Sequence, residues 1–128
     1  MEIRKYQREK DEVKLMALLK KEGEAWSCYW QEEVSLKYKE ALVNSITYVA
    51  YEGDLLCGYC RALDDQGFYL YVCDLLVDID HRGKAIGKQL IEKLKDGYPH
   101  QNIYIMSDVD QYYLKQGYQL IGSIFEVK

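Results

Sequence analysis

Ten consecutive residues, Phe68 to Val77, constrain the fold more than any other part of the sequence. They read Phe-Tyr-Leu-Tyr-Val-Cys-Asp-Leu-Leu-Val, so apolar side chains occupy almost every position instead of every second one. A strand with this pattern is buried on both faces, which places it in the middle of a sheet that is covered on both sides. We therefore predict a central strand over Phe68–Val77.

The segments around this strand predict the remaining elements. Besides the central strand we expect strands over Ile3–Tyr6, Ile46–Tyr51, Leu55–Leu63, Ile103–Met106 and Tyr118–Val127, and helices from Asp11 as N-cap to Gly23, from about Ser35 to Asn44, from Ile86 to Gly97 and over Asp108–Gln116. Because a helix joins the central strand to the next one, the order predicts a mixed α/β (α+β) sheet with a parallel crossover. A chain of 128 residues that is 48% hydrophobic is long enough for one core, so we expect a single domain over residues 1–128.

Composition excludes several classes of protein. The net charge of −4 argues against a nucleic-acid partner, since affinity for phosphate backbones needs clustered positive charge. No run approaches the roughly 20 apolar residues of a membrane span, and the charged start Met1–Arg4 is not that of a signal peptide. We expect a cytoplasmic location without a membrane partner. Cys57 and Cys60 have the C-x-x-C spacing, but in a strand such positions point to opposite faces, so no metal is expected.

The turn after the central strand carries the clearest chemical signal. It reads Arg82-Gly83-Lys84-Ala85-Ile86-Gly87 and leads directly into the helix that begins near Ile86. Unpaired amides at a helix N-terminus and the helix dipole can hold a phosphate or pyrophosphate, and small residues let it approach the backbone. Arg82, Lys84 and Lys88 would add counter-charge. The competing interpretation is a glycine-rich turn that only precedes a helix.

This turn resembles the acetyl-CoA motif of the GNAT family of N-acetyltransferases, Arg/Gln-x-x-Gly-x-Gly/Ala after a strand that ends in valine. Ala85 stands where the family usually has glycine, and we expect a helical φ there, which alanine tolerates. A second segment, Tyr112 to Tyr118, is similar to the family's Phe-Tyr-x-Lys-x-Gly-Phe. The resemblance implies a GNAT-like acyl-CoA acyltransferase fold, with a mixed central sheet flanked by helices on both faces, and acetyl-CoA as co-substrate.

The resemblance also implies roles for individual residues. Backbone amides of the central strand would hold the pantetheine arm and polarise the thioester carbonyl. The residues expected to bind acetyl-CoA are Leu75, Leu76, Val77, Arg82, Gly83, Lys84, Ala85, Ile86, Gly87 and Lys88. Tyr113 matches the tyrosine that protonates the departing sulfur, although it could instead only pack or steady that sulfur, and Tyr112 is expected to face the core. A phenol with pKa near 10 can serve a thiol with pKa near 8.5.

An attacking amine has to lose a proton, and Asp74 is the best candidate for the base. It is an acid within an apolar run, where burial would raise its pKa. A structural role is the alternative, in which case Glu24, Glu32 or a water chain would accept the proton. Three aromatic residues between the first two helices, Trp26, Tyr29 and Trp30, lie where the family has a wall of its acceptor site. They either enclose the substrate or pack as a satellite core.

Together these features predict an acyltransferase (N-acetyltransferase) that moves the acetyl group of acetyl-CoA to a primary amine of a small molecule or peptide. We expect direct attack in a ternary complex, since no Cys–His pair is evident for a covalent relay. The alternative function is a non-catalytic acyl-CoA-binding regulatory module. A third, weaker interpretation is an enzyme that acts on protein or tRNA-linked amines. The expected assembly is a monomer or homodimer.

Overall fold

The computed structural model describes residues 1–128 and is built around one five-stranded sheet in the order β1-β2-β3-β4-β5. Its elements are β1 (Glu2–Lys5), α1 (Arg8–Glu22), the 3-10 helix η1 (Glu24–Trp26), α2 (Ser27–Trp30), α3 (Glu32–Asn44), β2 (Ile46–Glu52), β3 (Leu55–Asp64), β4 (Tyr69–Val77), the 3-10 helix η2 (Ile79–His81), α4 (Ile86–Gly97), β5 (Asn102–Ile105) and α5 (Asp110–Lys115). Strands β1 to β4 are antiparallel neighbours, and β5 is parallel to β4. The mixed sheet with a helical crossover is therefore confirmed.

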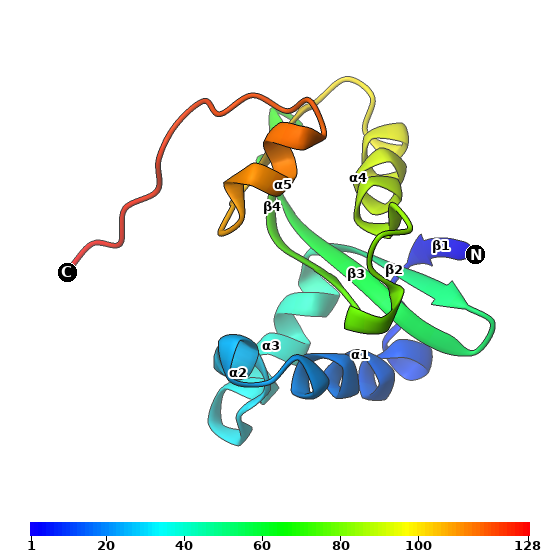
Figure 1. The fold of residues 1–128 in the computed structure, drawn as a ribbon. Coiled ribbons are helices and arrows are strands. Elements are labelled where there is room, and N and C mark those ends of the chain that lie inside the picture. The colour runs from blue at the N-terminus through cyan, green and yellow to red at the C-terminus, as the bar shows by residue number, and fades with distance from the viewer.

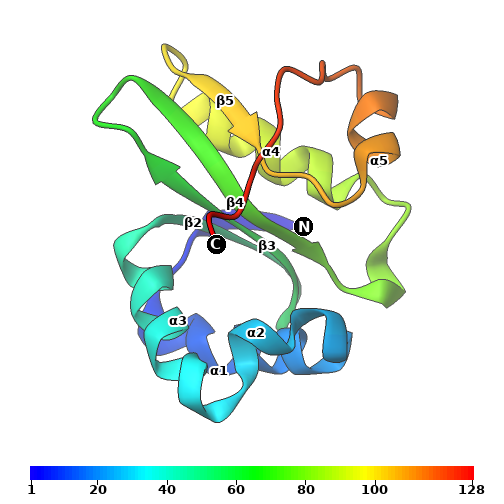
Figure 2. The ribbon, with the colours of Figure 1, turned by 90° about the vertical axis from the view of Figure 1, so that its left-hand side faces the viewer.

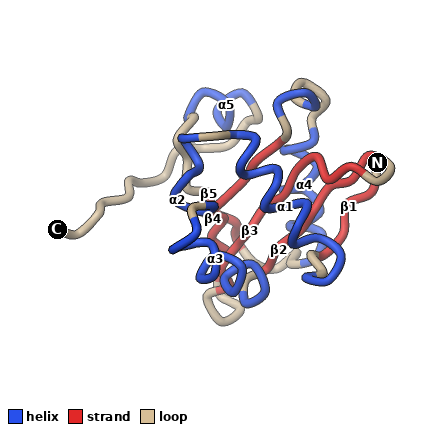
Figure 3. The backbone as a smooth tube through the Cα atoms, turned by 90° about the horizontal axis from the view of Figure 1, so that it is seen from below, coloured by secondary structure: helices blue, strands red, loops and turns tan.

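Helices cover both faces of the sheet (Figures 1 and 2). The helices α1, α2 and α3 lie on one face, and Figure 3 shows them in front of the strands when the molecule is seen from below, whereas α4 lies on the other face. Each face has its own buried core, and β4 contributes to both: Leu76 to the α1–α3 core, Leu70 and Val72 to the α4 core. This double burial explains the continuous apolar pattern of β4.

A β-bulge at Cys73 lets β4 serve both cores. Arg61 of β3 pairs with Asp74 and Ala62 pairs with Val72, so Cys73 has no opposite residue on β3. The extra residue moves the side chains that follow it to the other face of the sheet. Val72 therefore packs in the core beneath α4, while Asp74 bonds a tyrosine of α3.

The strands β4 and β5 separate after a short paired stretch. Their register runs only from Tyr69 opposite Asn102 to Val72 opposite Ile105, and the Met106 amide donates to the Val72 carbonyl at 2.9 Å. Beyond this bond, residues 74–77 of β4 pair with β3 alone. One edge of β4 therefore carries unpaired backbone groups in its second half.

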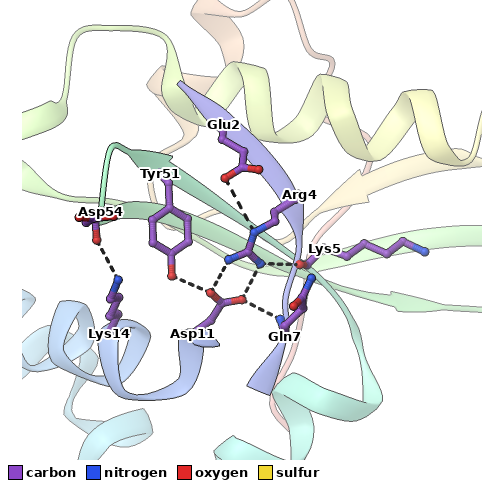
Figure 4. A network of polar contacts seen from close by, with 8 residues as sticks. All are labelled: Glu2, Arg4, Lys5, Gln7, Asp11, Lys14, Tyr51 and Asp54. Atoms are coloured by element: carbon purple, nitrogen blue, oxygen red, sulfur yellow. Dashed lines mark hydrogen bonds and ion pairs between the residues drawn. The ribbon is translucent and has the colours of Figure 1, made fainter. Parts of the chain in front are cut away.

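Asp11 does not cap α1, and this prediction was wrong. The helix begins at Arg8, and the Asp11 side chain is fully buried inside its first turns. Its carboxylate accepts two hydrogen bonds of 2.8 Å from Arg4, one of 2.6 Å from the Tyr51 hydroxyl and one of 2.7 Å from the Gln7 amide (Figure 4). These bonds join β1, β2 and the start of α1.

The predicted pattern of the C-x-x-C segment was also wrong. Gly58 pairs with Ala50 of β2 and Leu56 pairs with Tyr51, so a register shift leaves Cys57 without a partner on β2. As a result, the side chains of Cys57 and Cys60 are both buried in the core beneath α4. No group of three or more His, Cys, Asp or Glu side chains is placed to hold a metal ion. The absence of a side chain at Gly58 avoids a close contact, because a Cβ there would lie only 3.1 Å from the Leu76 carbonyl oxygen.

The expected last strand, Tyr118–Val127, does not form. After α5 the chain has no regular secondary structure and leads away from the rest of the molecule, to the left in Figure 1. A strand is stable only when a neighbour pairs with its backbone, and no strand of this chain pairs with these residues. None of the helices combines the length and the apolar character that a membrane span requires.

Candidate acyl-CoA site

The turn between β4 and α4 presents a row of unpaired backbone amides. No backbone or side-chain acceptor in the chain bonds the amides of residues 83–88, and the first amide to find a partner is that of Gln89, which donates to Ala85 at 3.0 Å. Such amides at the N-terminus of a 12-residue helix favour an anion. The turn therefore fits a diphosphate group.

The expected helical φ at Ala85 was wrong. Ala85 is the N-cap of α4 and has φ of 61° and ψ of 26°, which is the left-handed conformation. Glycine adopts this conformation freely, whereas for an L-residue with a side chain it costs about 1–2 kcal/mol of conformational free energy. The glycine that the family usually has at this position thus has a conformational reason. Gly83, with φ of 83°, provides the other left-handed position of the turn.

The basic residues of the turn differ in how they are engaged. The Arg82 guanidinium donates to the Val77 carbonyl at 3.0 Å and pairs with Glu22 of α1 at 2.7 Å. Lys88 is exposed and lies 3.9 Å from Glu92. Lys84 is exposed and forms no ion pair, so it can approach a phosphate without breaking one.

The end of α1 fixes the start of this turn. Lys21 lies 2.7 Å from a carboxylate oxygen of Asp78 and 2.9 Å from Asp80, and His81 bonds the other Asp78 oxygen at 2.8 Å. Burial raises the pKa of Asp78, but Lys21 and His81 outweigh it and hold that pKa below its ordinary value. Sequence patterns do not detect such contacts, because Lys21 and Asp80 are 59 positions apart.

The predicted thioester-binding stretch of β4 lies directly before the turn. Leu75 and Val77 are half-buried and pack against the α4 core, whereas Leu76 is buried in the α1–α3 core. All three residues pair with β3, and none pairs with β5. The unpaired edge of β4 and the unpaired amides of the turn therefore follow one another along the chain.

Asp74 lies at the centre of a buried polar cluster. It is 3% exposed, and its Oδ2 atom accepts a hydrogen bond of 2.6 Å from Arg61 Nε and another of 2.6 Å from the Tyr38 hydroxyl. The Tyr38 and Tyr59 hydroxyls are themselves 2.6 Å apart. Burial raises the pKa of the Tyr29 hydroxyl, and the negative charge of Asp74 raises it further. The cluster thus joins β3, β4 and α3 with α2, which carries Tyr29.

Arg61, Tyr38 and Tyr59 were missed at the sequence level. Arg61 was detectable, because an arginine inside the apolar strand Leu-Leu-Cys-Gly-Tyr-Cys-Arg-Ala-Leu needs a buried acidic partner. The tyrosines gave no such signal, since a tyrosine in a core strand or helix is ordinary.

The aromatic residues predicted to enclose the acceptor pack against the α1–α3 core. Trp26 and Tyr29 have ring centroids 5.4 Å apart, and Tyr29 lies 4.6 Å from Tyr38. The Trp30 indole donates to the Gly23 carbonyl at 3.1 Å, just after the end of α1. All three rings are only partly buried. They therefore support the core and still present a surface, next to the cluster that holds Asp74.

The two tyrosines of the second motif face different surroundings. Tyr112 does not face the core as expected; it is exposed, and a Cβ on Gly87 would lie 2.5 Å from its hydroxyl. Tyr113 stacks on Tyr118 with 6.2 Å between centroids and lines a cavity of about 530 Å³ between α4, β5 and the following chain. Burial raises the pKa of Tyr113 to about 12, so the phenol keeps its proton at neutral pH. No contact joins Tyr113 to Asp74, which bonds toward α3.

Comparison with known proteins identifies the family. Residues 43–120, which include both motifs, match the family model described as an acetyltransferase (GNAT) domain. A search of curated proteins finds no match.

Solved structures share the fold. A GNAT family acetyltransferase from Streptococcus pneumoniae TIGR4 superposes with a TM-score of 0.75 at 21% identity, covering 99% of this chain and 98% of that one. For ribosomal-protein-alanine N-acetyltransferase from Brucella melitensis biovar Abortus 2308 the TM-score is 0.73 at 19% identity, with 99% and 98% covered. An aminoglycoside 6'-N-acetyltransferase complexed with coenzyme A superposes with a TM-score of 0.66 at 19% identity, covering 91% of this chain and 73% of that one. The chain therefore belongs to the GNAT family of N-acetyltransferases, enzymes whose acetyl donor is acetyl-CoA.

Proposed function

We propose that this protein transfers the acetyl group of acetyl-CoA to a primary amine of a small molecule or peptide by direct attack in a ternary complex. The observation that carries the proposal is the continuous stretch of unpaired backbone, from the open edge of β4 to the amides of residues 83–88. A diphosphate bound at the turn would direct the pantetheine arm along the open edge of β4. The acceptors named for two structural neighbours, an aminoglycoside and a ribosomal-protein alanine, support an amine as the acceptor class.

In this proposal the residues of the open β4 edge act through their backbone. Amides of the stretch 75–77 hold the arm and donate to the thioester carbonyl oxygen, which gains negative charge when the amine attacks. One oriented donor of this kind contributes about 3–4 kcal/mol to such a step. Lys84 and Lys88 would supply counter-charge to the phosphates, and Arg82 would hold the turn against α1 through Glu22.

Tyr113 is proposed as the acid that returns a proton to the departing sulfur. Its hydroxyl is protonated at neutral pH, and it lines the cavity that β5 borders. For Asp74 the contacts support the structural alternative, since Oδ2 already accepts from Arg61 and Tyr38 and the side chain is buried. We assign it the role of holding β4 at the bulge, and water then carries away the proton of the amine.

Two measurements test the function. Coenzyme A should raise the midpoint of thermal unfolding, because ligand at about 100 times its dissociation constant adds about 2.7 kcal/mol to stability. Release of free thiol from acetyl-CoA should then be measured with a panel of primary amines: a polyamine, an aminoglycoside and a peptide with a free N-terminus. Absence of any coenzyme A effect would contradict the proposed site.

The substitution Tyr113→Phe separates catalysis from binding. It should lower turnover by about a hundredfold to ten-thousandfold, as the loss of a general acid does, and leave the thermal shift by coenzyme A in place. Tyr104→Phe is the matched control, since Tyr104 lines the same cavity from β5 and should retain full turnover. Binding without turnover on any amine would favour the alternative, a non-catalytic acyl-CoA-binding module.

A further inference from the structure

The hydroxyl of Tyr112 lies where the turn after β4 meets the open edge of that strand. A Cβ built on Gly87 would lie 2.5 Å from this hydroxyl oxygen and 3.6 Å from the Leu75 Cδ2 atom. Gly87 belongs to the turn with the unpaired amides, and Leu75 belongs to the part of β4 that pairs with β3 alone. The side chain of Tyr112 therefore adjoins both halves of the candidate site.

The short helix α5 brings this hydroxyl to the turn. Figures 1 and 2 show α5 on the side of the sheet where α4 lies, opposite α1, α2 and α3. The rings of Tyr112 and Tyr113 meet edge to face, with 5.1 Å between their centroids. Tyr113 lines the cavity beside β5, whereas the Tyr112 hydroxyl lies against Gly87. The two neighbouring tyrosines therefore serve different places.

The Tyr112 hydroxyl is a free donor. The hydroxyls of Tyr38, Tyr51 and Tyr59 form hydrogen bonds within the chain, whereas that of Tyr112 forms none. Burial raises the pKa of Tyr112 above its ordinary value of 10, so the hydroxyl keeps its proton at neutral pH. A protonated phenol adds a donor to the amides at the start of α4. Phenylalanine, which the family pattern has at this position, lacks that donor.

We propose that the Tyr112 hydroxyl donates a hydrogen bond to the diphosphate of bound acyl-CoA, beside the amides of residues 83–88. This assignment rests on the proposed function, because it adds a binding residue to the same site. The diphosphate is a better partner than the sulfur for two reasons. The hydroxyl lies against Gly87, within the turn that fits an anion, and a charged oxygen forms a stronger hydrogen bond than a neutral acceptor.

Calorimetric titration of the variant Tyr112→Phe with coenzyme A tests the proposal. Loss of one hydrogen bond to a charged group should weaken binding by about tenfold to a hundredfold. ADP, which carries a diphosphate without the pantetheine arm, should lose affinity by a similar factor. Because the ring remains, the midpoint of thermal unfolding without ligand should stay as in the wild type. Weakened binding of coenzyme A with unchanged binding of ADP overturns the proposal, since the hydroxyl would then contact the arm.

The matched control is Tyr98→Phe. Tyr98 is the residue that follows α4, at the end of the helix opposite the turn, and it packs against the α4 core. A helix of 12 residues places it roughly 18 Å from the turn. This variant loses the same hydroxyl group at the other end of the same helix, so it should bind coenzyme A and ADP as the wild type does.

Steady-state kinetics separate Tyr112 from the proposed acid. Tyr112→Phe should raise the KM for acetyl-CoA and keep the wild-type kcat at saturating acetyl-CoA, whereas Tyr113→Phe lowers kcat. A low kcat of Tyr112→Phe at saturation overturns the proposal, because its hydroxyl would then act on the departing sulfur. Wild-type affinity of Tyr112→Phe for coenzyme A also overturns it and leaves the proposed function standing. A wild-type protein that does not bind coenzyme A contradicts the proposed function itself.

The substitution Gly87→Ala tests the geometry independently. In the wild-type background the new methyl group would displace the Tyr112 hydroxyl, so the affinity for coenzyme A should fall as it does in Tyr112→Phe. In the double variant G87A/Y112F the nearest atoms to the methyl group lie 3.6 Å away, an ordinary contact distance. The double variant should therefore bind about as well as Tyr112→Phe alone. Losses that add in the double variant would mean that the two positions act independently, which overturns the proposed contact.

Discussion

Arg61 and Asp74 form the ion pair on which the inner end of the site depends. Burial by itself lowers the pKa of Arg61, but the hydrogen bond and charge of Asp74 raise it above its ordinary value, so the guanidinium stays charged inside the sheet. In the variant Arg61→Met, the Asp74 carboxylate still accepts the hydrogen bond from Tyr38 but no longer has a cation beside it. A buried charge left in this way costs about 3–5 kcal/mol of unfolding free energy, which urea denaturation measures.

Two controls make this prediction specific to the buried pair. Arg61→Lys keeps a cation on the same strand and should lose less stability than the methionine variant. Arg8→Met removes an arginine that pairs with Glu12 and Glu40 on the surface, and should have little effect. Equal stability of Arg61→Met and the wild type would mean that Asp74 does not depend on Arg61.

At the scale of elements, the start of α1 depends on the ionised Asp11. Burial raises the pKa of Asp11, but bonds from Arg4, Tyr51 and the Gln7 amide outweigh it and lower the pKa below the ordinary value of 3.8. A carboxylate with a depressed folded-state pKa stabilises the fold above the unfolded pKa, and this contribution is lost as pH falls through the folded one. Asp11→Asn should therefore cost about 3 kcal/mol at pH 7 and flatten the loss of stability below roughly pH 4.

The matched substitution for this pH experiment is Asp54→Asn. Asp54 is exposed, and its carboxylate forms no hydrogen bond or ion pair; only its backbone carbonyl accepts a hydrogen bond, from Lys14. Its replacement should change neither the unfolding free energy at pH 7 nor the decrease of that free energy below roughly pH 4. Both are measured by urea denaturation over a range of pH. An Asp11→Asn protein that follows the wild-type profile would contradict the role given to the buried carboxylate.

Elements with a clear period or a clear end were predictable from the sequence. The hairpin of β2 and β3, the continuous apolar pattern of β4 and the helix from Ile86 to Gly97 all follow from local pattern and glycine positions. The bulges at Cys57 and Cys73 were not, because one inserted residue in a ladder depends on the partner strand. The last strand was predicted from its own residues, whereas a strand also needs a neighbour.

The candidate site divides in the same way. Its turn was predictable, since glycines, basic residues and the helix start are contiguous from Arg82 to Lys88. The cluster around Asp74 was not, because Tyr38 of α3 reaches it over 36 positions. The left-handed Ala85 was missed because alanine rarely adopts that conformation, and only the turn as a whole imposes it.

At the scale of the whole molecule, two cores share one sheet and β4 belongs to both. The interior strands β2, β3 and β4 have neighbours on both edges and helices on both faces, whereas the second half of β4 is open on one edge. Amides that open only on global unfolding exchange most slowly. We therefore expect the slowest hydrogen exchange in β3, and faster exchange in residues 83–88, whose amides have no acceptor.

Coenzyme A should change this exchange map at two places only. Amides of residues 73–77 and 83–88 should slow together, because one ligand would occupy both the open edge of β4 and the turn. The junction of β1 with α1 at Asp11 lies at the far edge of the sheet and should exchange as before. Exchange mass spectrometry with and without coenzyme A measures this. Protection at the turn without protection of residues 73–77 would mean that the diphosphate binds while the pantetheine arm lies away from the open edge of β4, and the roles given to the β4 amides would then be wrong.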